Sequence, residues 1–348
     1  MVRASQGGLV TTTGTRPATA SPARARVHPA LLAMAGSLCI ALSSVFIKVS
    51  GASGSTSAFW RCLFSLPVLA ALVWWERRRG TARRRLVLPV LAGVGLGVDF
   101  VLWGDAIALV GAGIATVLLS VQVVIVPAVA YLVFRERPSK RFVRAAPVLL
   151  AGIVLAGGLA GTPAFGPDPV LGAVLALGAG VGFAAYLVLM RRSTGPGARD
   201  HTLFVATLSA GAVAVAIGVP TGRLDLSPGW PALGWLLALA LIGQIAGWLL
   251  ISTALPRLSS ATGATMMLLQ PVGAILMGVV LLGERPSAPQ LAGCLVVLGA
   301  VAFVGAGSRR SPRGGSAAAR QRRPEHRSFG GTPPGSDRVG RAGHRTGT

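Results

Sequence analysis

Ten predominantly apolar stretches divide this chain, and each is long enough to cross a lipid bilayer as a helix. A crossing helix needs about 20 mainly apolar residues. The stretches lie at about residues 30–50, 57–76, 86–108, 112–134, 142–160, 170–190, 201–219, 232–255, 262–282 and 288–306. The third and fourth would be too long for any bilayer as one helix, so we expect Gly111 to divide them. The sequence therefore predicts an all-α integral membrane protein with ten transmembrane helices.

The distribution of basic residues predicts how this protein lies in its membrane. The net charge of +23 would indicate nucleic-acid binding in a soluble protein, but here the arginines lie between the apolar stretches and in the tails. With the N-terminus in the cytoplasm, 28 of the 33 Lys and Arg residues are cytoplasmic, 3 lie within the stretches, and only Arg223 and Arg285 are external. The positive-inside rule therefore predicts a multi-pass protein of the cell (inner) membrane with both termini cytoplasmic. Nucleic acid is not an expected partner.

A short motif that occurs twice indicates that the chain consists of a duplicated unit. Arg-Glu-Arg-Pro-Ser at 135–139 returns as Gly-Glu-Arg-Pro-Ser at 283–287, and Gln122 and Gln270 each lie fourteen positions before the glutamate. An odd number of helices in each copy means that the second copy enters the membrane upside down. Inverted repeats place a substrate site near the midplane, between the two halves. Duplication for stability alone is the competing explanation.

This division predicts four segments. Residues 1–29 form a disordered cytoplasmic N-tail and residues 307–348 a disordered basic C-tail, because neither can bury a core. Residues 30–160 form the first repeat, with helices 1–5, and residues 161–306 form the second, with helices 6–10. The arginines of the C-tail are candidates for contact with anionic headgroups at the cytoplasmic face.

Two stretches resemble the EamA-type family of the drug/metabolite transporter superfamily. They are GWLLISTALPRLSSATGATMMLLQPVGAILMGVVLLGERPS at 247–287 and its weaker partner LWGDAIALVGAGIATVLLSVQVVIVPAVAYLVFRERPS at 102–139. The FWRCLFSLP run at 59–67 is similar to the arginine-bearing second helix of that family. The resemblance implies a ten-helix secondary transporter of the inner membrane that exports small metabolites or drug-like compounds. Asp105 departs from it, because the family usually has an uncharged residue there.

Three charged residues inside the stretches are candidates for substrate binding. Asp99 lies near the midplane, where a carboxylate costs on the order of 2.5–3.5 kcal/mol on insertion scales. Such a residue is by default a site hypothesis, and it suits coupling to protons; the alternative is an ion pair with Arg61 or Lys48. Lys48 and Arg61 lie in the outer half. One of them can pair with Asp105 and leave the other free to bind an anionic or zwitterionic substrate, or both can snorkel to the headgroups.

Uncharged polar and aromatic residues complete the predicted site. Gln122, Gln244 and Gln270 lie near helix centres, where amides need another helix or a solvated ligand. Trp103 and Trp248 can stack on a substrate and Tyr186 can add a hydroxyl, although simple packing explains aromatic residues equally well.

Other chemistry is not predicted. The sequence contains no HExxH, GxSxG or Walker pattern, so neither an enzyme nor a cofactor or metal site is expected. Glycine runs at 93–97 and 178–182 lie within apolar stretches and predict close helix packing. The predicted partners are a small-molecule substrate, the lipid bilayer and protons. A lipid-linked carrier flippase and a non-transporting membrane scaffold are the alternatives to a metabolite exporter.

Overall fold

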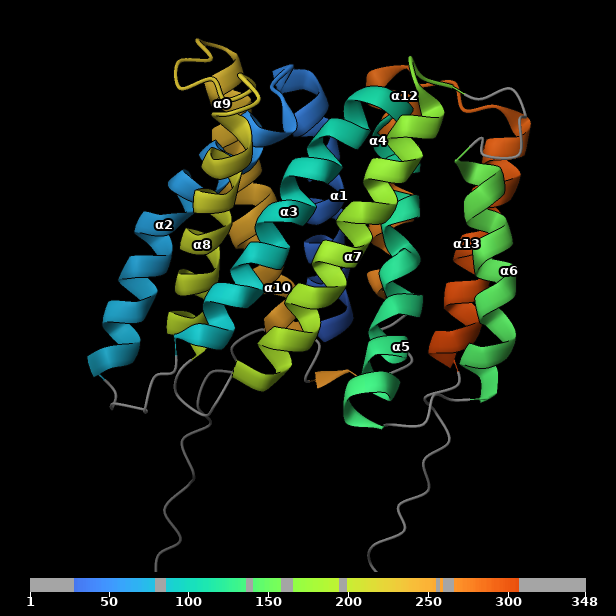
Figure 1. Cartoon of the computed structure of the whole chain (residues 1–348), viewed down its shortest axis with the longest axis horizontal. Helices are drawn as coiled ribbons and strands as arrows, with labels where there is room; N and C mark the ends of the chain where they lie inside the picture. The colour runs from blue at the N-terminus through green and yellow to red at the C-terminus, as the bar shows by residue number, and fades with distance from the viewer. Residues whose placement is uncertain are drawn as a thin grey trace, which may run out of the picture. The chain divides into compact units, whose positions relative to one another are not determined.

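The computed structural model describes residues 28–78, 86–135, 140–157, 165–193, 199–254, 257–258 and 266–306. Most of both predicted tails lies outside these residues. All the helices belong to one unit, Met1–Arg309 (Figure 1). They are α1 (Pro29–Ser50), α2 (Gly54–Arg78), α3 (Val87–Val110), α4 (Ala112–Leu118), η1 (Leu119–Val121), α5 (Gln122–Phe134), α6 (Lys140–Ala156), α7 (Pro169–Ser193), α8 (Arg199–Gly218), α9 (Ala232–Ala238), η2 (Leu239–Ala246), α10 (Gly247–Ala254), α12 (Leu269–Leu282) and α13 (Ala288–Ala306).

The described part of the chain is helical and contains no strand, as the sequence predicts. Within the described residues, seven helices are long and apolar enough to cross a membrane. Two of them are continuous helices made of several segments: α4 continues through η1 into α5, and α9 continues through η2 into α10. The helices α12 and α13 are apolar but shorter. Ten crossings therefore stay a prediction.

Gly111 divides the third and fourth predicted stretches, and this prediction is confirmed. Its φ of 90° lies in the region that side-chain-bearing residues avoid, and its N–H donates to the carbonyl of Ile107 at 3.2 Å. The chain reverses there between α3 and α4. This reversal, with residues 51–53, 165–168, 219–231 and 283–287, marks what we call the upper end, at the top of Figure 1.

Glycines set the spacing between α3 and α7, which pack along much of their length. A methyl group on Gly95 would lie 2.7 Å from the carbonyl oxygen of Gly182, and one on Gly182 would lie 2.7 Å from that of Gly95. Neither position can hold a larger residue unless the backbone moves. The two glycine runs therefore serve close helix packing, as predicted.

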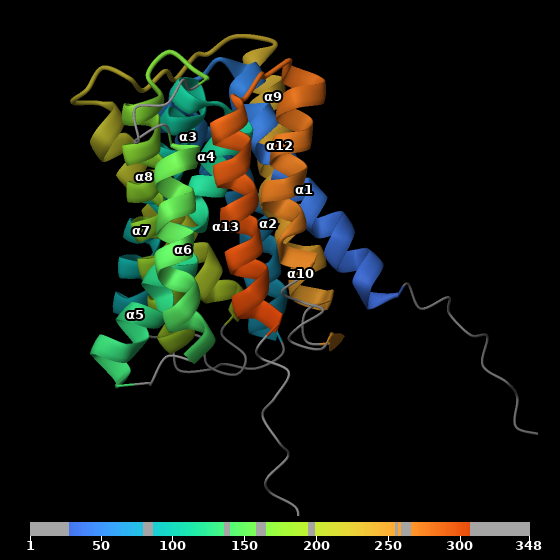
Figure 2. The ribbon, with the colours of Figure 1, turned by 90° about the vertical axis from the view of Figure 1, so that its right-hand side faces the viewer.

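Helix pairing follows the inverted repeat. The first helix of the first half, α1, packs on η2, α10 and α12, and the first helix of the second half, α7, packs on the corresponding α3 and α5. Three further pairs join equivalent helices of the two halves: α2 with α8, α4 with α12, and α6 with α13. Figures 1 and 2 show α6 and α13 side by side along their length. Substrate sites of such repeats lie where the halves meet.

Candidate substrate site

Polar contacts at the upper end account for two of the predicted charged residues. The Lys48 ammonium donates to the carbonyls of Ile107 and Ala108, each at 3.2 Å, in the last turn of α3. Carbonyls in the last turn of a helix attract cations. Lys48 therefore holds the end of α3 against the end of α1.

Asp105 pairs with Arg223, so the expectation that Lys48 or Arg61 neutralises it is wrong. One Asp105 oxygen accepts from the Gly54 N–H at 2.8 Å, at the start of α2, and the other lies 2.9 Å from the Arg223 guanidinium. The 219–231 connection folds over the start of α2, where Thr56 Oγ1 also donates to the Arg223 carbonyl at 3.0 Å. A loop contact of this kind has no signature in a helix pattern.

Glu284, in the second copy of the repeated motif, forms hydrogen bonds that join the two halves. Its carboxylate is only 4% exposed and accepts from the N–H groups of Ala112 at 2.7 Å and Gly113 at 3.4 Å. These are the first N–H groups of α4, which have no partner within the helix. Gly111 and Gly278 leave room for the carboxylate, because a methyl group on either would lie 2.9 Å or less from it. Sequence reasoning identified the repeated glutamate but did not anticipate this contact.

A second polar group lies inside the bundle, around Arg61 of α2. The Arg61 side chain is only 4% exposed, and its Nε donates to Gln244 Oε1 of η2 at 2.8 Å. The guanidinium lies over the Phe100 ring at 3.9 Å and 6.0 Å from the Trp103 ring centroid, both on α3. Such cation–π contacts strengthen when the cation is desolvated.

Several buried polar atoms of the bundle have no hydrogen-bond partner, and those of Arg61, Asp99 and Trp103 lie in this region. Of seven such buried side-chain atoms in the described part of the chain, five are Ser43 Oγ, Arg61 Nη1, Asp99 Oδ1, Trp103 Nε1 and Gln122 Oε1. We call these five residues, with Gln244 and Phe100, the polar cluster. Buried polar groups are normally paired because leaving one unpaired costs about 1–3 kcal/mol.

The backbone shows how these residues come together. Ser43 on α1 lies against Gly243, the residue before Gln244, since a methyl group on Gly243 would lie 2.0 Å from Ser43 Oγ. Asp99 and Gln122 each lie against α7 but on different faces of it, because their neighbours Gly182 and Gly180 are two positions apart in the helix. A methyl group on Gly182 would lie 3.0 Å from the Asp99 nitrogen, and one on Gly180 would lie 3.7 Å from the Gln122 nitrogen. Helices of both halves thus contribute to the polar cluster.

The other predicted residues surround this group or lie apart from it. Tyr186 and Trp248 flank Phe183, with ring centroids 5.7 Å and 6.4 Å from it, and Tyr186 packs in the same core as Phe100. The Gln270 amide donates to Met267 Sδ at 3.6 Å. Among the described residues there is no hydrogen bond between Gln122 and Gln270.

Sequence reasoning missed three features of the candidate site: Phe100, Ser43 and the π-helix around Gln244. Phe100 is one apolar residue among many in α3, and nothing in the sequence separates it from packing residues. The segment that carries Gln244, η2, is a π-helix of eight residues. Such segments are frequent at functional sites because they redirect side chains. Only Ser43, a small polar residue opposite Gly243, gives a weak sequence signal.

Inverted helical repeats with polar side chains between the two halves are typical of membrane transporters. The chain belongs to the EamA-like transporter family, whose model matches residues 28–158 and 170–306. A solved structure described only as the crystal structure of a protein shares 18% sequence identity with this chain. The match covers 81% of this chain and 99% of the chain in that structure, with a TM-score of 0.54. At that identity the likeness concerns the fold alone. No curated protein matches the sequence.

Proposed function

We propose that this protein is a secondary transporter that exports a small polar metabolite by alternating access. The observation that carries the proposal is the polar cluster, in which donors and acceptors without partners are buried among apolar helices. Side chains of this kind in a membrane interior normally face a cavity or a partner. A bound substrate with its water satisfies them for part of each cycle.

The chemistry of the unpaired atoms favours a substrate with both signs of charge, or an anionic one. Arg61 Nη1 and Trp103 Nε1 are donors and suit a carboxylate or phosphate. Asp99 Oδ1 and Gln122 Oε1 are acceptors and suit an ammonium or a hydroxyl group. The aromatic rings of Tyr186 and Trp248 then face the less polar part of the substrate, and Gln270 contacts it in another state of the cycle.

In this proposal the protein crosses the cell membrane ten times, with both termini in the cytoplasm. The Lys and Arg count places the upper end outside. The contacts of Glu284 with α4, of Lys48 with α3 and of Asp105 with Arg223 support the assignment of this end as the external gate. Transport requires these contacts to open while the halves rock about the polar cluster.

Proton coupling is assigned to Asp99. Its carboxylate is 3% exposed, lies near the charge of Arg61 and does not form an ion pair with it. A carboxylate that lacks a fixed partner can exchange a proton between the two sides as the gates alternate. Export is then driven by protons that enter from outside.

The test begins with substrate identification. Metabolites are compared, inside cells and in the medium, between a deletion strain and one that overexpresses the protein. We expect at least one small zwitterionic or anionic compound to accumulate outside with overexpression and inside upon deletion. Efflux of that compound from proteoliposomes then follows, with Arg61→Gln as the inactive variant. Unchanged metabolites, together with translocation of a lipid headgroup in the same vesicles, would identify a flippase and refute the proposal; no flux of either kind would identify a scaffold.

A further inference from the structure

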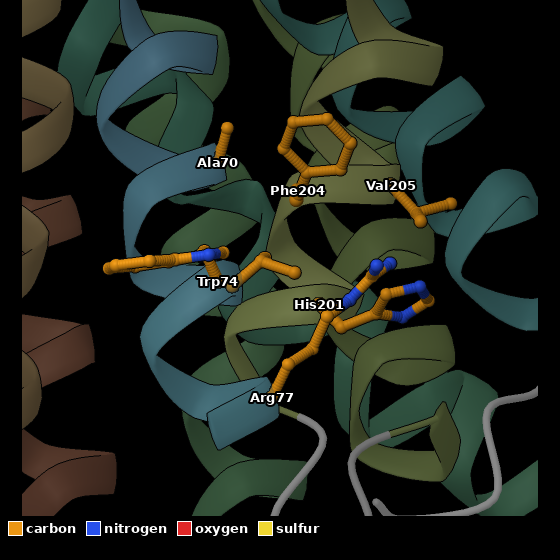
Figure 3. Close-up of a pocket in the computed structure, with 7 residues that line it drawn as sticks. Ala70, Trp74, Arg77, His201, Phe204 and Val205 are labelled. Carbon is orange, nitrogen blue, oxygen red and sulfur yellow. The ribbon is translucent and has the colours of Figure 1, made fainter. Parts of the chain in front are cut away.

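A pocket of about 250 Å³ lies between α2 and α8, far along both helices from the upper end (Figure 3). Its lining consists of Ala70, Val73, Trp74, Arg77, His201, Phe204 and Val205. None of these residues belongs to the polar cluster. The pocket lies near the last turn of α2 and the first turn of α8, and Arg77 and His201 lie toward these ends.

The walls of the pocket are mainly apolar and partly open to the surroundings of the bundle. Trp74 is 57% exposed, and Ala70 is also exposed. A surface of this kind in a bilayer meets hydrocarbon chains rather than water. Figure 3 shows Phe204 and Ala70 toward one end of the pocket, and Arg77 and His201 toward the other. The pocket therefore has an apolar part and a basic mouth.

The mouth has a fixed geometry, and it carries Arg77 and Arg78 together with the acidic Glu76 and Asp200. Glu76 accepts from the N–H groups of Asp200 at 3.3 Å and His201 at 3.1 Å, which fastens the start of α8 to α2. Its negative charge is thereby directed at the helix N-terminus. Arg78 stacks on the Trp74 ring at 3.7 Å, and the next basic pair at this end is Arg191 and Arg192 on α7.

We propose that this pocket binds an anionic phospholipid, with one acyl chain against Val73 and Phe204 and the headgroup phosphate on Arg77. Basic pockets between transmembrane helices on the cytoplasmic side favour such headgroups. The volume is below the about 300–1,000 Å³ of sites for drug-sized ligands, which favours a single chain segment over a whole metabolite. Because α2 carries both Arg77 and Arg61, a lipid bound here contacts the same helix that carries the arginine proposed to bind the substrate.

The test measures lipid binding by the full chain in detergent, by native mass spectrometry. Palmitoyl-oleoyl phosphatidylglycerol and phosphatidylcholine with the same chains are added at equal concentration. We expect preferential retention of the glycerol lipid, and Arg77→Gln to reduce that preference about fivefold, which corresponds to about 1 kcal/mol. The matched control is Arg285→Gln, which removes an exposed arginine at the upper end and should leave the preference intact.

A second variant keeps the inference testable if removing one arginine alters the fold. Ala70→Trp fills the pocket and leaves every charge in place, and it should reduce retention of both lipids. Equal retention of the two lipids by the wild type would overturn the proposal. So would equal effects of Arg77→Gln and Arg285→Gln, or full retention by Ala70→Trp.

Discussion

The upper end and the polar cluster handle buried polar groups in opposite ways. At the upper end Glu284 and Asp105 each accept hydrogen bonds with both oxygens, and Lys48 donates twice. In the polar cluster, Arg61 has one partner for its Nε and none for Nη1, and Asp99 Oδ1 has none. Satisfied groups hold helices together, whereas unsatisfied groups are available to a ligand. Location in the membrane alone does not distinguish these two roles.

This difference separates two kinds of mutational effect. Removing a satisfied group leaves its partners unpaired and lowers stability. Removing a group that awaits a ligand lowers transport and has less effect on stability, because fewer contacts in the empty protein depend on it.

The largest expected effect is on transport by Arg61→Gln. The variant loses the donor assigned to the substrate anion, and a hydrogen bond to a charged group is worth about 1.5–3 kcal/mol. We therefore expect transport at low substrate concentration to fall about 10- to 100-fold. The measurement is efflux from proteoliposomes with protein amount and orientation matched.

The control for this variant is Arg285→Gln, an exposed arginine at the upper end. It removes the same charge outside the polar cluster, and its transport should match the wild type. If Arg61→Gln transported normally while its apparent melting temperature fell, Arg61 would serve to hold helices together, like the paired groups of the upper end. The proposed difference between the upper end and the polar cluster would then be wrong.

Asp99→Asn should abolish the dependence of transport on the proton gradient. With one proton per cycle, each pH unit across the membrane supplies about 1.4 kcal/mol, so wild-type export should rise as the outside is acidified. Asparagine keeps the size of the side chain and one acceptor oxygen, and it carries no acidic proton. Efflux is measured over a series of external pH values, and a variant with the wild-type profile would remove Asp99 from the coupling step.

Glu284→Ala should affect stability more than transport of a substrate already bound. It leaves the first N–H groups of α4 without acceptors, at a cost of about 1–3 kcal/mol. The apparent melting temperature in detergent should fall, measured at one scan rate because unfolding of such proteins is often irreversible. Arg285→Ala, the exposed neighbour, should leave it unchanged. Glu284→Gln keeps an acceptor and should lie between the two, and equal melting temperatures for all three would show that the contact is dispensable.

The fold was more accessible from the sequence than the site. Three features can be recognised without knowledge of packing: the lengths of the apolar stretches, the unequal distribution of Lys and Arg between the two sides, and the motif that recurs 148 residues later. Arg61, Asp99, Trp103 and Gln244 were also found, because polar and indole groups inside apolar stretches are rare and costly. The structure brings all four to one region of the bundle.

The partners of these residues could not be predicted in the same way. Whether Lys48 reaches a substrate or the end of α3 depends on how far α1 and α3 are shifted along each other. A shift of one helical turn, about 5.4 Å, would place Lys48 beside different groups. The same holds for Glu284 and α4. The π-helical stretch around Gln244 alters the direction of a side chain without altering the hydrophobic pattern, so sequence periodicity does not indicate it.

The smallest expected effect on stability comes from breaking the ion pair between Arg223 and Asp105. It tests which contacts of the upper end contribute to stability. The Arg223 side chain is 56% exposed, so solvent screens the pair, and such pairs are typically worth about 0–1 kcal/mol. Asp105 is 10% exposed and also accepts from the start of α2, so Asp105→Ala should lower the melting temperature more than Arg223→Gln. The double variant should then resemble Asp105→Ala alone. Equal losses from the two single variants would mean that the ion pair, and not the contact with α2, accounts for the contribution of Asp105 to stability.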